Sequence, residues 1–234
     1  MANVLATEEE LRKYYKSKNN MFRVVQYRGY VVPEEYIPLK NDTDNLSHEE
    51  EELPVKMTYT QFISKYQSST LKEVKDAISD YVFEHAARDN DSIIVRWHPE
   101  RKVGPSIRNL VDIMEHGNIM KAIIIADEGS TPMCKNIIRN VKSVKGMTID
   151  VWDLADSQIF VPDDVTIPIH RILSVKEKAE LMRKYAVDKT QLPEIERDDV
   201  MVKYLGALKG NLIECKRVSQ SEPTFYELYY RMVK

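Results

Sequence analysis

Residues 190–195 read TQLPEI, and the chain then continues to Asp199, Tyr204-Leu205-Gly206 and Gly210. Pro193 has a fixed φ and pushes Leu192 toward extended backbone, so a helix before it cannot run through it. Gly206 is free to adopt the left-handed conformation that ends a helix. The segment predicts a rigid corner followed by a short helix, which is typical of a small docking module rather than of a catalytic centre.

Local signals on both sides of this corner predict a compact α+β unit. Ser174 and Glu177 form a capping-box pattern, which predicts a helix that ends before Thr190. Asp198 or Asp199 is expected to cap the short helix that runs through Tyr204. Aromatic and β-branched residues concentrate at 212–213 and 225–233, and these runs predict strands that cover the helices. A unit of about 70 residues is small, so we expect a partner to steady it.

The chain before this unit has the pattern of an α/β layer. Thr7 and Glu10 form a second capping-box pattern, and Gly29 follows the helix that they open, where a C-terminal cap is needed. A short helix is expected at 62–66, whereas residues 70–88 fit a helix and a strand equally well. Three short runs predict strands, and helices are expected between them, one of them after Thr131-Pro132. The strands are predicted at 93–95, 123–125 and 147–152.

We therefore expect two domains of different class. The N-terminal α/β domain covers residues 1–152 and contains an acidic loop at 41–54. A linker follows at 153–164, and the C-terminal α+β domain covers residues 165–234.

Charge and composition exclude several function classes. From Val165 to the end there are 13 Lys and Arg against 10 Asp and Glu, whereas the whole chain has a net charge of −3. The acidic stretch supplies the excess of negative charge. A pI near 6.0 argues against an autonomous high-affinity nucleic-acid binder, because such binding depends on neutralising phosphates. Any contact with DNA is expected to be weak and auxiliary.

Cys134 and Cys215 are the only cysteines, and their spacing indicates neither a disulfide framework nor a zinc site. The first residues lack the pattern of a signal peptide, and the longest apolar run is too short for a membrane span. We expect an intracellular protein without a cofactor, a metal, a membrane partner or a small-molecule substrate.

The chain resembles the fifth shared subunit of the eukaryotic nuclear RNA polymerases, whose C-terminal part is similar to the H-type subunit of archaeal RNA polymerase. The matching residues keep the family's order, and the resemblance extends upstream to Arg28-Gly29-Tyr30, Val103-Gly104 and Thr131-Pro132. The chain departs from the family at Val200, where a proline is usual. The C-terminal matches are Ile167-Pro168-Ile169-His170, Thr190 to Ile195, Asp199, Tyr204-Leu205-Gly206, Gly210, Arg217, Ser219 and Tyr230-Arg231.

The resemblance implies a non-catalytic subunit of a nuclear DNA-directed RNA polymerase, found in the nucleus, the nucleolus included. It implies that the N-terminal domain is a lower jaw beside downstream duplex DNA, nuclease-like in fold but without activity, and that the C-terminal domain docks on the largest subunit among the other polymerase subunits. The DNA-proximal residues are expected to be Thr131, Pro132, Met133 and Lys135. The expected subunit interface comprises His170, Gln191, Leu192, Pro193, Tyr204, Gly206, Arg217, Tyr230 and Arg231.

Two alternatives stay open at this point. Asp91, Glu100 and Lys102 imitate the acidic pair and lysine of a free-standing Mg²⁺-dependent nuclease, in which carboxylates hold the metal and lysine steadies the attacking water. The flanking prolines and glycine place Glu100 and Lys102 in a loop, which weakens this hypothesis. The other alternative is a regulatory adaptor that recruits a factor through the acidic residues 41–54.

Overall fold

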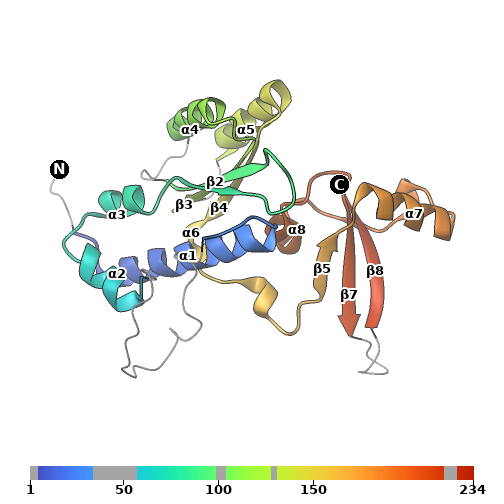
Figure 1. Ribbon diagram of the computed structural model, residues 1–234, viewed down its shortest axis with the longest axis horizontal. Helices are drawn as coiled ribbons and strands as arrows, with labels where there is room; N and C mark the ends of the chain where they lie inside the picture. Colours follow the sequence, from blue (N-terminus) through green and yellow to red (C-terminus); the bar gives the residue numbers. More distant parts are fainter. Residues whose placement is uncertain (1–4, 34–56, 99–103, 128–130, 219–225) are drawn as a thin grey trace. The chain divides into compact units, whose positions relative to one another are not determined.

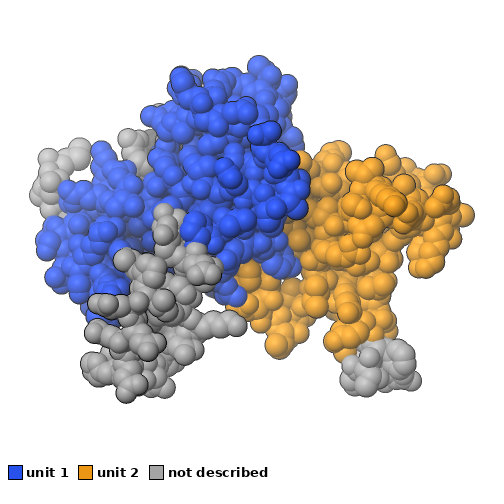
Figure 2. Space-filling view, viewed as in Figure 1, with its two compact units in different colours: residues 1–159 blue, residues 160–234 orange. Residues whose placement is uncertain are grey.

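The computed structural model describes residues 5–33, 57–98, 104–127, 131–218 and 226–234. The described residues fall into two compact units, residues 1–159 and 160–234, which we call unit 1 and unit 2 (Figure 2). The acidic stretch 41–54 lies outside the described residues. Among the helices of the described ranges, none is long and apolar enough to cross a membrane.

Unit 1 contains a four-stranded sheet with helices on both faces (Figure 1). Its strands lie in the order β1-β2-β3-β4, with β1 antiparallel to β2 and the other three parallel. The helices are α1 (Glu8–Tyr27), α2 (Tyr59–Tyr66), α3 (Leu71–Ala77), α4 (Gly104–His116), α5 (Pro132–Lys145) and α6 (Leu154–Ser157). The strands are β1 (Tyr81–Glu84), β2 (Ser92–Trp97), β3 (Lys121–Ala126) and β4 (Thr148–Asp153).

The ambiguous segment 70–88 contains both a helix and a strand. Thr70 caps α3 through a capping box with Glu73, and α3 ends before Asp80. Asp80 has a φ of 62°, a left-handed conformation that reverses the chain, so that β1 can begin at Tyr81. The helical and the alternating patterns of apolar residues could not be separated in the sequence, because α3 has 7 residues and β1 has 4. Elements this short do not show a clear periodicity.

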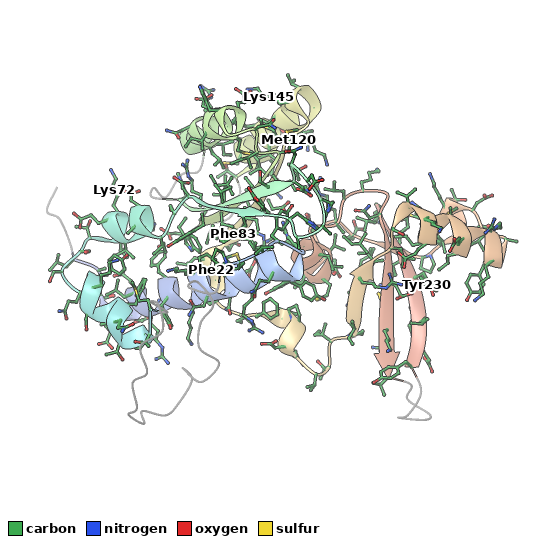
Figure 3. The ribbon with its side chains drawn as sticks, viewed as in Figure 1. Phe22, Lys72, Phe83, Met120, Lys145 and Tyr230 are labelled. Carbon is green, nitrogen blue, oxygen red and sulfur yellow. The ribbon has the colours of Figure 1, made fainter. Side chains whose placement is uncertain are left out.

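Alternating side chains divide the core of unit 1 into two layers. Ile94 and Ile124 face α4 and α5, where they pack with Leu110, Met114 and other buried residues. The opposite face of the sheet meets α1. There Phe22 makes edge contacts with Tyr81 and Phe83, with ring centroids 5.0 and 5.4 Å apart (Figure 3). The predicted capping box of Thr7 and Glu10 at the start of α1 is confirmed.

Unit 2 is built on a second mixed sheet of four strands in the order β5-β7-β8-β6. The capping box of Ser174 and Glu177, the Asp199 cap and the left-handed Gly206 are confirmed. The strands are β5 (Ile169–Ile172), β6 (Glu194–Ile195), β7 (Leu212–Val218) and β8 (Tyr226–Val233). The helices are η2 (Val161–Asp163), α7 (Val175–Tyr185), η3 (Lys189–Gln191) and α8 (Val200–Leu205).

The two faces of the unit 2 sheet are covered by different helices. Leu181 of α7 packs with Leu212 and Met232 on one face. Val202 of α8 packs with Ile213 and Val233 on the other face. The strands at 212–218 and 226–233 match the predicted runs, whereas β5 and β6 were not predicted. The region expected to be a linker contains α6 and η2, and the division between the units falls after Ile159.

Candidate functional site

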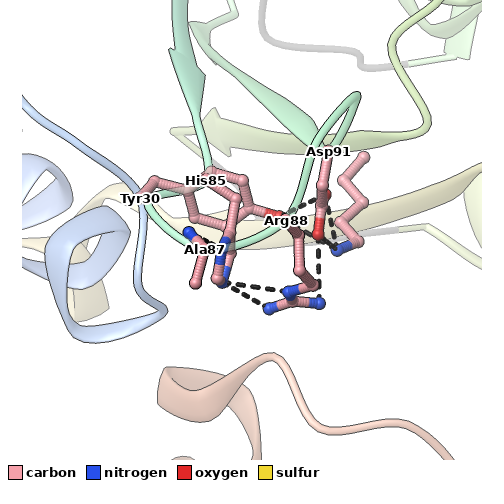
Figure 4. Close-up of polar contacts among 6 residues, drawn as sticks. Tyr30, His85, Ala87, Arg88 and Asp91 are labelled. Carbon is pink, nitrogen blue, oxygen red and sulfur yellow. Dashed lines mark hydrogen bonds and ion pairs between the residues drawn. The ribbon is translucent and has the colours of Figure 1, made fainter.

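A polar cluster joins three segments of unit 1 at the amino ends of β2 and β3 (Figure 4). The Asp91 carboxylate accepts hydrogen bonds from Lys121 Nζ, 2.8 Å from each carboxylate oxygen, and from Tyr30 Oη at 2.9 Å. Arg88 lies 3.0 Å from the same carboxylate. The chain after α1 is thereby fastened to the turn before β2 and to the start of β3.

The pKa shifts in this cluster follow from those contacts. Burial would raise the pKa of Asp91, but hydrogen bonds from Lys121 and Tyr30 and two nearby cations outweigh it and lower the pKa. Burial, followed by the hydrogen bond to Asp91, raises the pKa of Tyr30 well above its usual range. Asp91 is therefore a charged, fully engaged structural carboxylate at physiological pH.

This geometry does not suit the nuclease hypothesis. Asp91 precedes β2, whereas Glu100 and Lys102 follow it and lie outside the described residues. A six-residue strand is about 20 Å long, and catalytic and binding sites of parallel sheets lie at the carboxyl ends of the strands. Among the residues that the structure describes, no cluster of three or more His, Cys, Asp or Glu could hold a metal ion.

The carboxyl end of β3 carries a second polar cluster, in which every member is used within the fold. Asp127 accepts hydrogen bonds from Tyr14 Oη at 2.6 Å and from Lys75 Nζ at 2.5 Å. Lys75 is almost completely buried, with 3% of its surface exposed. A buried lysine needs such a partner, so Asp127 ties α3 and α1 to the end of the central strand.

The expected DNA-proximal residues form the N-terminus of α5. Thr131 is the N-cap, and its hydroxyl accepts a hydrogen bond from the Cys134 amide at 3.3 Å. Pro132 occupies the first turn, where its missing N–H costs nothing. Met133 is 66% exposed, and Lys135 is also exposed, one turn into the helix. The structure brings all four residues to the surface at one helix end.

A basic stripe continues from this end along the exposed side of α5. Lys135, Arg139 and Lys142 follow one another at helical spacing, so they share a face, and Lys145 in the last turn pairs with Glu115. We call Lys135, Arg139 and Lys142 the basic stripe; Lys145 lies outside it, seven residues after Ile138 and therefore on the side of the helix that packs on the core. That side packs into the core through Cys134 and its neighbours. Of the basic residues of α5, only Lys135 is among the four residues expected from the sequence to be DNA-proximal, although Arg139 and Lys142 follow it at the same helical spacing.

Three of the expected interface residues share one face of the unit 2 sheet. Arg217 and Arg231 are both exposed, and the strand register places them on the same face of β7 and β8. His170 lies on that face opposite Cys215, and its Nδ1 contacts the Pro168 carbonyl oxygen at 2.6 Å. Burial lowers the pKa of His170, so its imidazole is expected to be neutral near physiological pH.

The other expected interface residues serve the internal structure of unit 2 to different degrees. Gln191 accepts a hydrogen bond from the Asp188 amide at 2.7 Å, and Leu192 packs in the α7 layer. Pro193 is exposed, but its carbonyl oxygen accepts a hydrogen bond from the Met232 amide at 2.8 Å. The corner predicted from TQLPEI therefore aligns β6 with the end of β8.

Tyr204 lies in the core of unit 2, with 1% of its surface exposed. Its hydroxyl accepts a hydrogen bond from the Val161 amide at 3.2 Å, and its ring meets Phe160 edge-on. Gly206, with a φ of 62°, ends α8. Tyr230 is half-buried, and its ring centroid lies 6.5 Å from that of Tyr185. These residues shape the unit, and the exposed arginines offer contacts at its surface.

A group of ion pairs that joins β5, β7 and α7 was not predicted from the sequence. Arg171 Nε donates to Glu214 at 2.8 Å, and its Nη1 donates to Glu177 at 2.7 Å. Glu177 is also the capping-box residue of α7, since it accepts a hydrogen bond from the Ser174 amide. The cap was visible in the sequence, but its link to β5 and β7 depends on the strand register.

Comparison with known proteins connects these features to one protein family. Residues 159–233 match the family described as RNA polymerase Rpb5, C-terminal domain. The chain is 30% identical over 132 residues to the Dictyostelium discoideum "DNA-directed RNA polymerases I, II, and III subunit rpabc1", an alignment that covers 56% of this chain and 67% of the relative.

Two further relatives show how far the similarity extends. The Caenorhabditis briggsae "DNA-directed RNA polymerases I, II, and III subunit RPABC1" is 26% identical over 231 residues, which cover 97% of this chain and 99% of the relative. The Thermococcus kodakarensis "DNA-directed RNA polymerase subunit Rpo5" is 44% identical over 79 residues, which cover 34% of this chain and 94% of the relative. The chain therefore belongs to the RPABC1 (Rpb5) family of non-catalytic RNA polymerase subunits, whose C-terminal domain is similar to archaeal Rpo5.

Proposed function

We propose that this chain is a subunit of a nuclear DNA-directed RNA polymerase and that unit 2 is its assembly domain, docked on the largest subunit. One observation carries the proposal. In the Rpo5 comparison, 79 residues of this chain cover 94% of a chain that is itself a polymerase subunit, and residues 159–233, nearly all of unit 2, match the C-terminal domain of the family. A part that makes up nearly a whole subunit in one organism is the natural candidate for the part that binds other subunits here.

The surface of unit 2 supports this assembly role. Arg217 and Arg231 share one face of the sheet, four residue positions apart along the strands, and Pro193 marks an exposed corner beside the end of β8. Arginine is favoured at protein interfaces because its planar group forms paired hydrogen bonds with carboxylates. We propose this face as part of the contact with the largest subunit.

We propose that unit 1 forms the lower jaw beside downstream duplex DNA, with the N-terminus of α5 and the basic stripe directed at the phosphates. α5 carries four basic residues and no acidic one. Exposed phosphate contacts are individually weak and are screened by salt, so this surface guides DNA rather than binding it tightly. The chemistry of transcription then belongs to other subunits.

The first test is a tagged purification of the full chain from native nuclear extract, with the co-purifying chains identified by mass spectrometry. We expect the two largest polymerase subunits, and their identity will name the polymerase or polymerases concerned. Arg217→Glu with Arg231→Glu should lower that recovery. Lys176→Glu with Arg183→Glu makes the same charge change at exposed positions of α7 and serves as the control. Recovery of neither large subunit with the unaltered chain would refute the assignment.

A further inference from the structure

One edge of the unit 2 sheet is only partly covered. β8 pairs with β7 along seven of its residues, but on its other side β6 pairs only with Met232 and Val233. Within the described residues, no strand is paired with this side of β8 from Tyr226 to Arg231. Six residues of backbone therefore form an open sheet edge.

The hydrogen bonds at the end of β8 show which amides face this edge. The Met232 amide donates to Pro193 O at 2.8 Å, and the Lys234 amide donates to Ile195 O at 3.1 Å, both toward β6. The Val233 amide donates to Asn211 O at 3.0 Å, toward β7. Because successive amides of a strand point to opposite sides, the amides and carbonyls of Tyr226, Leu228 and Tyr230 face the open edge.

This edge has little of the usual protection of an exposed strand. Natural sheets blunt their edges with proline, bulges, charged side chains or a covering element, because a free edge pairs readily with another chain, and of these β8 carries only the charged Glu227 and Arg231 among its described residues. The described residues of β8 contain no proline, and exposed apolar or aromatic side chains border its free half. Tyr226, Leu228 and Tyr229 expose 55%, 51% and 46% of their surface.

We propose that an extended segment of a partner polypeptide adds to this edge as a fifth strand, beside residues 226–230 of β8. The inference rests on the assembly role proposed for unit 2, and it specifies how a partner subunit is held. At the end of the same edge, the amides of Met232 and Lys234 already donate hydrogen bonds to the carbonyl oxygens of Pro193 and Ile195. The added strand would therefore lie on the same side of β8 as β6, beyond the end of β6. Main-chain hydrogen bonds supply affinity in this mode of recognition, and alternate side chains supply specificity.

The two faces of β8 define the chemistry of the added segment. On one face Tyr226 and Leu228 are exposed beside Ile169 and Val218, which are 65% and 49% exposed, so alternate residues of the segment are apolar. On the other face Tyr229 is exposed between two charged residues, Glu227 within the paired stretch and Arg231 just beyond it, so polar residues are favoured on that side of the segment. A segment of five residues spans about 16 Å.

Amide hydrogen exchange at single-residue resolution tests the proposal. The probe is the full chain, measured alone and in polymerase purified through the tagged chain. We expect the Leu228 and Tyr230 amides to exchange at least about tenfold more slowly in the complex, because new backbone bonds protect them. The Tyr229 and Arg231 amides, directed at β7, should be slow in both states and serve as internal controls.

A pair of variants separates backbone pairing from side-chain packing. Leu228→Pro removes an amide that faces the edge and leaves the amides directed at β7 in place. Leu228→Ala trims the same side chain but keeps the amide. We expect Leu228→Pro to reduce recovery of the partner subunit by up to about tenfold, the effect of one lost backbone bond, and Leu228→Ala to reduce it much less.

The outcomes distinguish this inference from the proposed function. If polymerase subunits co-purify but the Leu228 and Tyr230 amides exchange as fast as in the free chain, strand addition is refuted and the assembly role stands. Strand addition is also refuted if Leu228→Pro and Leu228→Ala reduce the recovery of the partner subunit equally while the Tyr229 and Arg231 amides stay protected. Side-chain packing would then explain the binding. If no polymerase subunit co-purifies, the proposed function itself fails.

Discussion

Gly29 shows how a single residue joins two elements of unit 1. Its φ is 90°, a backbone conformation that residues with a Cβ atom rarely adopt, and it lies just after the end of α1. A Cβ atom there would lie 2.9 Å from His85 Nε2, so the chain leaves α1 in close contact with the end of β1. The backbone bond from the Ala86 amide to Gly29 O, 2.9 Å long, holds the same junction.

Gly29→Ala is expected to lower the free energy of unfolding of unit 1 by about 2–3 kcal/mol, since it adds backbone strain and crowds His85. Gly210→Ala is the matched control, because Gly210 has a φ of 87° but a Cβ atom there would meet no other atom within 4 Å. It should cost only about 1 kcal/mol. Urea unfolding measures both values, and equal losses would show that the contact with His85 contributes nothing.

Glu177 links the stability of unit 2 to pH. The hydrogen bond from the Ser174 amide, followed by that from Arg171, lowers the pKa of Glu177 from 4.5 to about 2. The unfolded chain then binds more protons than the folded chain between these two values, so stability falls as the pH falls from about 4.5 to about 2. Above that window the full contribution is present.

Glu177→Gln tests this link, because glutamine keeps the capping box but cannot pair as a charge with Arg171. Urea midpoints of the variant should lie below those of the unaltered chain at about pH 6 and approach them near pH 2. A difference between the two proteins that does not shrink across this range would contradict the role assigned to the Glu177 carboxylate.

At the scale of an element, α5 combines a packed face with a charged one. Its apolar residues meet the sheet, so the basic stripe is held in a fixed direction by the core. Lys135→Glu with Arg139→Glu should make DNA release from the assembled polymerase easier. In a plot of log K for DNA binding against log salt concentration, the slope should become shallower by about two. This is about one unit for each lost phosphate contact.

The matched control for α5 is Lys16→Glu with Lys72→Glu, at exposed positions of α1 and α3 in the same unit (Figure 3 labels Lys72). This control makes the same change in net charge but leaves the basic stripe intact. A salt dependence altered equally by both pairs would indicate a general effect of charge and would argue against a DNA-facing role for α5.

At the scale of the whole molecule, the two units have separate cores. Unit 2 has its own sheet and two buried clusters, and the part of the chain that matches the C-terminal domain of the family, residues 159–233, coincides with it. We expect residues 160–234 to fold alone, with a stability of about 3–5 kcal/mol, which is typical of so small a core. Circular dichroism of this fragment during urea unfolding should show one cooperative transition.

Ile213→Ala is the informative variant for this fragment. Ile213 is completely buried between β8 and α8, and its truncation should cost about 2–5 kcal/mol, most of the fragment's stability. Val218→Ala, at a 49% exposed position of the same strand, is the control and should leave the transition nearly unchanged. A fragment without any cooperative transition would show that unit 2 needs unit 1 or a partner in order to fold.

The sequence alone determined the features that depend on near neighbours in the chain. The capping boxes at Thr7 and Ser174, the Asp199 cap and the left-handed Gly206 were predictable, because each requires only residues within four positions of one another. The short β-branched runs at 93–95 and 123–125 were predictable as strands for a similar reason. The membership of the polymerase family also followed from the ordered C-terminal residues.

Only the tertiary structure decided the features that depend on distant pairing. β5 and β6 are too short to have a clear pattern, and they are strands because β7 and β8 supply their hydrogen-bond partners. The sequence offered Asp91 only as a candidate metal ligand of a nuclease, and its structural role became visible when the fold placed Lys121 beside it. The open edge of β8 is likewise a property of the sheet order, since a strand's own sequence does not state which side of it remains unpaired.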